Sequence, residues 1–287
     1  MKSKLEFIGA MLIFGTIGLF RRMIPFPSSL IAATRGLIGT LFLLFFLTLT
    51  HQKLSVSSIK KNLIPLVLSG TLMGFNWILL FESYNYTSVA VSTVCYYMAP
   101  VFVILAAPVF FKEKLTLKKI ICAAFAFAGI LLVSGIFKTS FTGINEIKGV
   151  LFGLAAAILY ASVILIKKKL PSIESFDRTN LQLGTSAVVL FPYTMTTENL
   201  SSLTFDGNVL ILLLITGIVH TGIAYTLYFH SIKTLDTQSI AIYSYIDPMS
   251  AILFSALFLN ETVTAIEMIG MVLILGSAFL SEIQKKS

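Results

Sequence analysis

The sequence GFNWILLFESYNYTSVAVSTVCYYMAPVFVILAAPVFFKEKLT, at Gly74–Thr116, returns as GIAYTLYFHSIKTLDTQSIAIYSYIDPMSAILFSALFLNETVT at Gly222–Thr264. The two copies align without a gap at an offset of 148 residues, and about 11 of the 43 positions are identical. Two apolar segments that are alike by chance would align Leu with Ile, but they would rarely align Gly, Tyr, Pro and Glu together. The chain therefore contains an internal duplication. The recurring pairs include Gly74/Gly222, Phe81/Phe229, Ser83/Ser231, Tyr97/Tyr245, Pro100/Pro248, Phe110/Phe258, Glu113/Glu261 and Thr116/Thr264.

The composition around this duplication is that of an integral membrane protein. Of the 287 residues, 56% are apolar and only 12% are charged, against roughly 25% charged in an ordinary soluble domain. The mean hydropathy of +0.92 indicates the same class. The two cysteines, Cys95 and Cys122, lie inside apolar runs, which excludes a disulfide scaffold and a zinc ribbon.

The apolar runs between polar breaks predict ten transmembrane helices, because a helix needs about 20 mostly apolar residues to cross the hydrocarbon layer. These runs consume nearly the whole chain and leave no room for a soluble domain. Any function therefore lies within the helical bundle. The predicted spans are about 5–24, 28–49, 63–84, 89–111, 117–137, 148–166, 178–197, 208–231, 238–259 and 264–282.

The basic residues predict the orientation of these spans. If the N-terminus lies inside, the inner connections hold about 16 lysines and arginines and the outer connections about 4. The positive-inside rule then places both termini in the cytoplasm of a multi-pass protein of the plasma (inner) membrane. The net charge of +8 is spread over short clusters, which excludes a nucleic-acid partner. The start of the chain has no convincing signal-peptide cleavage site.

The duplication and the span count together predict an inverted repeat. Each half, residues 1–137 and 148–287, holds five spans, and an odd number reverses the direction of the second copy. The predicted fold class is an all-α integral membrane protein of ten transmembrane helices, arranged as two inverted five-helix repeats. This is the architecture of alternating-access carriers, whose binding sites lie near the midplane between the repeats.

Several motifs of the first half carry a resemblance to a known family: Phe81–Tyr84 followed by Thr87, Tyr96–Val101, Phe111–Thr116 and Gly129–Leu132. Together they resemble the EamA-type branch of the drug/metabolite transporter superfamily. The second half echoes them at Tyr245–Pro248, at Asn260–Thr264 and at Gly270. The resemblance implies ten helices in two inverted five-helix units and, commonly, export of amino acids or other small metabolites. The family often has an aromatic or small residue where this chain has Glu82.

Ionisable residues within a membrane span are functional candidates by default, because a charge at the bilayer centre costs on the order of 3 kcal/mol. Arg35 and Glu82 are expected in the outer third of the bilayer, at a depth that predicts an ion pair. The pair has two interpretations: a structural contact, or a functional one. In the second, protonation of Glu82 opens an outer gate, or Glu82 binds an amine while Arg35 binds a carboxylate. The repeat places His230 opposite Glu82, toward the cytoplasm.

His220 and Asp247 are expected near the midplane. Imidazole titrates in the range useful for proton coupling, so His220 is either a proton-sharing partner of Asp247 or a structural residue. Asp247 directly precedes Pro248, and a proline inside a helix frees the carbonyl group one turn earlier. Pro248 and its copy Pro100 are therefore predicted helix hinges. The predicted proton-coupling or gating residues are Arg35, Glu82, His220, His230 and Asp247.

Aromatic and amide side chains are the candidates for lining a substrate cavity. Part of such a set belongs to the interfacial aromatic belt, but Trp77, Tyr96 and Tyr97 lie too deep for it. Their rings would stack an aromatic substrate or hold an ammonium group. Glu113 and Glu261 are expected instead to bind backbone amides at the starts of the fifth and tenth spans. The predicted substrate-binding residues are Asn76, Trp77, Glu82, Tyr96, Tyr97, Tyr160, Tyr225 and Tyr245.

The sequence therefore predicts a secondary transporter that works by alternating access, a proton-coupled exporter of small metabolites such as amino acids or amines. It contains no nucleotide-binding motif, no metal-ligand spacing and no sign of a cofactor. We expect a functional monomer that is not an enzyme. Two alternatives remain within transport: an uncoupled facilitator, and a carrier of drugs or quaternary amines. From another class, the alternative is a membrane-embedded enzyme acting on lipid-linked substrates.

Overall fold

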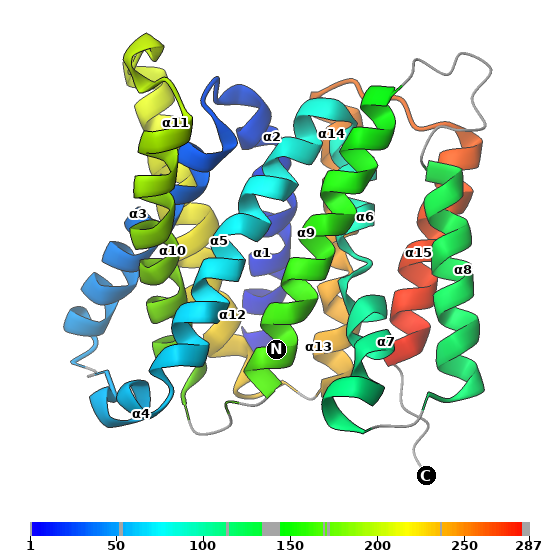
Figure 1. Cartoon of the computed structure of the whole chain (residues 1–287), viewed down its shortest axis with the longest axis horizontal. Helices are drawn as coiled ribbons and strands as arrows, with labels where there is room; N and C mark the ends of the chain where they lie inside the picture. The colour runs from blue at the N-terminus through cyan, green and yellow to red at the C-terminus, as the bar shows by residue number, and fades with distance from the viewer. Residues whose placement is uncertain are drawn as a thin grey trace.

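The computed structural model describes residues 2–51, 54–112, 115–133, 144–168, 170, 173–235 and 237–282 (Figure 1). These residues form helices and connections, and no strand occurs among them. The helices are α1 (Lys2–Gly15), α2 (Ile17–Met23), α3 (Ser28–Leu49), α4 (Val56–Lys61), α5 (Leu63–Tyr86), α6 (Val89–Tyr96), α7 (Ala99–Phe111), α8 (Leu117–Val133), α9 (Ile144–Lys168), α10 (Ser175–Thr197), η1 (Leu200–Ser202), α11 (Gly207–Gly217), η2 (Ile218–Ile223), α12 (Ala224–Ile232), α13 (Thr237–Ser244), α14 (Ile246–Phe258) and α15 (Ala265–Glu282).

Six helical segments of the described chain are long and apolar enough to cross a membrane, when helices that follow one another almost directly are taken together. Two shorter apolar segments, Ile242–Phe258 and Ala265–Leu280, accompany them. Large apolar side chains such as Ile64 and Val109 are 82% exposed, as expected for a surface that faces lipid. The six segments are Lys2–Met23, Ser28–Leu49, Leu63–Tyr86, Val89–Phe111, Ile144–Lys167 and Gly207–Ile232.

The predicted spans coincide with described helices, with some differences at the ends. The predicted span 117–137 corresponds to α8, which is described only to Val133, and α9 begins at Ile144, earlier than the predicted 148. The helix α10 is long enough to span a membrane but more polar than the six segments above. A total of ten crossings in two inverted repeats remains a prediction.

Four of the predicted spans are interrupted rather than continuous. The first is broken at Thr16, the fourth at Tyr97 and Met98, and the ninth at Tyr245. The eighth contains a π-helical turn, η2. Pro100 and Pro248 lie in the first turns of α7 and α14, where a missing backbone N–H costs little. Each predicted hinge proline therefore lies at the start of a half-helix.

The two halves of the chain interdigitate, so the core lies between them. The helix α5 packs against α9 and α10, α3 against α10, α1 against α12 and α14, and α8 against α15 (Figure 1). Each of these pairs joins a helix that precedes residue 134 to one that follows residue 143. A site in the middle of the bundle is therefore built by both halves.

Candidate functional site

The breaks in the fourth and ninth spans meet in the middle of the bundle. Tyr97 ends one half-helix and Tyr245 precedes the other, and their ring centroids are 6.2 Å apart. The Tyr97 hydroxyl donates to Asp247 Oδ2 over 2.8 Å. The two tyrosines are 148 residues apart, which is the offset of the duplicated sequence. The same position of each copy therefore contributes to one junction.

The proline behind Asp247 explains a second contact at this junction. Pro248 has no N–H to donate to the carbonyl group of Ser244, four residues earlier. That carbonyl oxygen lies 3.3 Å from the Tyr97 hydroxyl, so a side chain from the other half occupies the place of the missing helical donor. Asp247 Oδ1 meets no donor from the described residues, and the residue stays partly accessible. The carboxylate thus keeps an acceptor available.

Arg35 forms the positive part of the site. It is 5% exposed, its Nε donates to Thr221 Oγ1 over 2.8 Å, and its guanidinium carbon lies 4.4 Å from the centroid of the Trp77 ring. A cation over an indole face is an attractive arrangement. The two terminal nitrogens of Arg35 donate to no residue that the structure describes. Arg35 is therefore oriented by its neighbours with a planar donor pair unused.

Two residues of the π-helical turn η2 contact the first half of the chain, one at α3 and the other at the break between α1 and α2. Thr221 accepts from Arg35 and donates to the Thr216 carbonyl over 3.0 Å. His220, 1% exposed, lies with Nε2 2.8 Å from Thr16 Oγ1 and Nδ1 3.4 Å from the Ile215 carbonyl oxygen. Thr16 is the residue at which α1 and α2 separate. The irregular turns of the first and eighth spans are therefore joined, and single π turns often occur at functional sites.

Aromatic and amide side chains surround these charges. Tyr96 stacks on Tyr160 with centroids 5.3 Å apart, and its hydroxyl lies 3.5 Å from Asn76 Oδ1. Asn76 is fully buried and donates to the Ala156 carbonyl, which joins α5 to α9. Tyr225 packs against Phe14, edge to face, at 5.3 Å.

Five polar contacts of the site join the two halves of the chain: Tyr97–Asp247, Tyr97–Ser244, Arg35–Thr221, Thr16–His220 and Asn76–Ala156. Arg35 and Asp247 are also close enough to interact electrostatically. A buried cation with free donors beside a carboxylate with a free acceptor can bind a ligand that carries both charges. The structure thus brings together Arg35, Trp77, Tyr96, Tyr97, Tyr225, Tyr245, His220 and Asp247.

The predicted ion pair between Arg35 and Glu82 is wrong. Glu82 accepts from Asn85 over 3.1 Å near the end of α5, whereas Arg35 faces Thr221 and Trp77. Phe81, within 6.0 Å of the guanidinium, shares the Arg35 side of α5 with Trp77. The next residue along a helix is turned by about 100°, so Glu82 points elsewhere.

The two predicted histidines lie in different places, and His230 lies near a helix end, in keeping with its predicted position away from the midplane. His220 does not share a proton directly with Asp247, because its ring contacts Thr16 and Ile215. His230 lies at the far end of α12, 64% exposed, and contacts Glu6 over 2.7 Å. It is therefore not part of the central site.

The predicted role of Glu261 is corrected, and Glu113 lies outside the described residues. Both carboxylate oxygens of Glu261 accept from the Val89 amide, over 3.1 and 2.9 Å, at the start of α6 rather than of α15. The start of α15 is instead capped by Thr264 and Glu267, which bond to each other's backbone amides.

Thr16 and Thr221 are functional candidates that the sequence reasoning missed. Threonine is common in membrane helices and donates readily to its own backbone. No pattern in the sequence therefore distinguished these two. The π turn that brings Thr221 to Arg35 had no sequence signal either.

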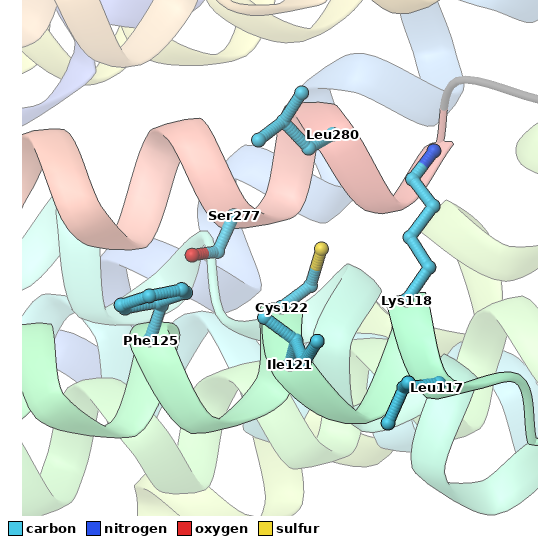
Figure 2. A pocket seen from close by; sticks show the side chains of 7 residues that line it. All are labelled: Leu117, Lys118, Ile121, Cys122, Phe125, Ser277 and Leu280. Atoms are coloured by element: carbon cyan, nitrogen blue, oxygen red, sulfur yellow. The ribbon is translucent and has the colours of Figure 1, made fainter.

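A hollow of about 380 Å³ lies elsewhere, between α8 and α15, and Figure 2 shows Lys118 at one end of it and Phe125 at the other. Leu117 and Phe125 on its wall are 73% and 53% exposed, which places it on the lipid-facing surface. None of the predicted site residues lines it. Among the described residues, no three His, Cys, Asp or Glu side chains gather as a metal ion would require.

The sequence profile of the EamA-like transporter family matches the chain twice, at residues 2–135 and 147–282. A Bacillus subtilis (strain 168) protein named uncharacterized transporter YxxF is 31% identical over 285 residues, which cover 98% of this chain and 90% of that protein. Uncharacterized transporter YvbV of the same organism is 24% identical over 264 residues, covering 91% and 84%.

Two more distant likenesses agree with these. Solute carrier family 35 member G1 of Mus musculus is 30% identical over 130 residues, or 42% of this chain and 35% of that protein. A crystal structure with 17% sequence identity superposes with a TM-score of 0.68 and covers 97% of this chain and 96% of its own. That structure shares the fold.

Proposed function

The chain belongs to the EamA-like transporter family, and from this premise we propose that it is a secondary carrier of small zwitterionic metabolites such as amino acids. Transport would proceed by alternating access between two inverted five-helix halves, residues 1–137 and 148–287. The named relatives are transporters, which favours this reading over an enzyme acting on lipid-linked substrates. The setting would be the plasma membrane, with both termini in the cytoplasm and a monomer as the working unit.

One observation carries the choice of substrate class: Arg35 and Asp247 each keep unused hydrogen-bonding capacity at the interface of the halves. A substrate carboxylate would bind the terminal nitrogens of Arg35, and a substrate ammonium would bind Asp247 Oδ1. The rest of the substrate would be enclosed by Trp77, Tyr96, Tyr97, Asn76 and Tyr225. Because each charged residue comes from a different half, a bound zwitterion would connect the halves.

Proton exchange follows from the same carboxylate. A proton and a substrate ammonium compete for Asp247, so one would leave as the other enters, which is antiport. His220 would be a second, separate protonatable group of the site. Thr16 donates its hydroxyl hydrogen to the Ile13 carbonyl, so both ring contacts of His220 are made at once only when both nitrogens carry protons. Loss of a proton would release one contact between η2 and the break at Thr16.

The test is transport in proteoliposomes, measured as the exchange of labelled amino acid supplied outside for protons inside. We expect this exchange to be saturable and to accelerate when the vesicle interior is more acidic than the outside. Asp247→Asn should lose both properties. The matched control is Glu198→Gln, because Glu198 also accepts from a neighbouring helix, through Ser29 at 3.0 Å, but lies outside the central site. Exchange that is unchanged in Asp247→Asn would refute the proposal.

A second candidate substrate is a quaternary amine, favoured by the stacked pair Tyr96–Tyr160 and by Tyr97 next to Asp247. Aromatic faces bind such cations well. The two candidates differ in their need for Arg35, which a cation without a carboxylate does not engage. Arg35→Lys would impair transport of the zwitterion and spare that of the quaternary amine.

A further inference from the structure

Two glycines of the first span pack closely against α14 and α6. Gly15 approaches the Asp247 carbonyl and Ser250, and Gly18 lies against Val89 at the start of α6. A side-chain carbon at either glycine would clash with these neighbours. Gly18 and Arg22, four residues apart, share one side of α2. The first span therefore packs against both α14 and α6 between Asp247 and one end of the bundle.

A set of charge-assisted contacts joins the helices at the same end. Arg22 donates to the Thr87 carbonyl over 2.8 Å and lies 3.4 Å from Glu261 Oε1. Glu261 in turn binds the Val89 amide with both oxygens. Three turns are thereby tied together at the upper side of Figure 1: the end of α2, the turn between α5 and α6, and the turn between α14 and α15.

The position of Glu261 makes these contacts sensitive to movement. Its backbone belongs to the turn that follows α14, the half-helix that begins at the Asp247 junction, and it binds the first amide of α6, a half-helix of the other half. A carboxylate at a helix N-terminus is stabilised by the helix dipole. Movement of α14 away from α6 would break this interaction. The contact therefore favours the arrangement in which these two half-helices lie close together.

The geometry points to Glu261 and Arg22 as a gate latch, a pair of side chains whose contacts hold the passage from Asp247 closed at one end of the bundle. This is the end at which α2 ends and α6 and α15 begin. This inference rests on the proposed transport function and adds residues to it. Under the predicted orientation, this end faces the cell exterior. The latch contacts no substrate, so Glu261 and Arg22 are positioning residues that set the share of protein open to that side.

The test measures access to a cysteine beneath the latch, without any substrate. Ser250→Cys places a thiol beside Gly15 in protein whose native cysteines carry Cys95→Ser and Cys122→Ser. A membrane-impermeant maleimide is applied to intact cells and to inverted vesicles. In Glu261→Ala and in Arg22→Gln we expect labelling from the latch side to rise about tenfold, the size expected for one lost charge-assisted hydrogen bond. Labelling from the opposite side should not rise.

Glu198→Gln is again the matched control: introduced into the same Ser250→Cys protein, it should leave the rate of maleimide labelling unchanged. The latch is refuted if both latch variants label at the parent rate in monodisperse protein, or if Glu198→Gln rises equally. Maleimide labelling needs no substrate, so it reports on the gate independently of transport. Faster labelling in a protein that exchanges no amino acid would overturn the proposed function and keep the gate, whereas normal exchange with unchanged labelling would overturn the gate alone.

Discussion

Asp247 is the residue on which the chemistry of the site depends most directly. Its carboxylate is held by a single side-chain donor, Tyr97, at a point where Pro248 has already removed a backbone donor. Asparagine has nearly the same shape and still accepts from Tyr97, so the junction of half-helices would persist. The charge alone would be lost.

We therefore expect Asp247→Asn to weaken binding of a zwitterion by about 10- to 100-fold, since hydrogen bonds to charged groups contribute about 1.5–3 kcal/mol. Calorimetric titration of purified protein with amino acids checks this. Tyr97→Phe should weaken binding less, because it removes the orienting donor and keeps the charge. Equal affinity in Asp247→Asn and the parent would contradict the assigned role.

Arg35 is expected to be intolerant of lysine. The guanidinium is planar, stacks on Trp77 and offers paired donors, whereas an ammonium group is a point charge without these properties. Arg35→Lys should raise the apparent KM for a zwitterion about tenfold or more and lower the melting temperature slightly. Uptake kinetics over a concentration series would decide it, and an unaltered KM would remove Arg35 from the substrate site.

At this scale the sequence singled out candidate residues but did not predict which of them lie in contact. Charge inside a span singled out Asp247 and Arg35, because burial of a charge is costly enough to need a reason. It predicted the wrong partner for Arg35, since depth along a helix does not give direction around it. Thr221 became visible only through the π turn that rotates it toward Arg35.

At the scale of elements, α8 and α15 pack backbone against backbone at Gly129 and Gly270. A side-chain carbon at Gly129 would lie 2.6 Å from the Gly270 carbonyl oxygen, and one at Gly270 would lie 2.7 Å from that of Gly129. Backbone carbonyls cannot turn aside as a flexible side chain can. The two helices would have to separate.

Gly129→Ala is therefore expected to lower the free energy of unfolding by about 1–3 kcal/mol, the usual penalty of overpacking. Thermal unfolding in detergent measures the change. Gly276→Ala, on α15, is the matched control, because nothing lies within 4 Å of its added carbon and alanine favours a helix by about 1 kcal/mol. If both variants melt alike, tight packing of α8 on α15 is not what limits stability.

Half of the interruptions were predictable from sequence. Pro100 and Pro248 predicted the breaks before α7 and α14, because proline removes a backbone N–H donor at a known position. The separation of α1 from α2 at Thr16 has no such marker, since the neighbouring Gly15 and Gly18 fit equally well in a continuous membrane helix. The break at Thr16 and the π turn η2 depend on contacts between distant segments. The contact between Thr16 and His220 is one of them.

At the scale of the whole molecule, the predicted orientation is open to a direct test. Ser201 and Lys60 are both exposed and belong to η1 and α4, the short helices that lie between α10 and α11 and between α3 and α5. These two connections lie at opposite ends of the bundle (Figure 1). If both termini are cytoplasmic, Ser201→Cys should react with an impermeant maleimide in intact cells and Lys60→Cys only after lysis. The reverse pattern would invert the assignment of every inner and outer group.

The duplication was the strongest sequence signal for the whole molecule, and the twofold family match agrees with it. Interdigitation of the halves had no signal in the sequence. Apolar residues cover most of each span on all sides, so periodicity does not tell which face meets a neighbour and which meets lipid.

The pairing of α8 with α15 has a consequence for biogenesis. The main neighbour of α8 is α15, the last helix among the described residues, which ends about 150 residues after α8. At roughly 5–20 residues per second, α8 waits about 7 to 30 seconds in the bilayer before its partner leaves the ribosome. During that interval Gly129 presents a bare backbone groove to other helices, so a chain that stops before residue 265 should attract membrane chaperones and quality-control proteases through α8.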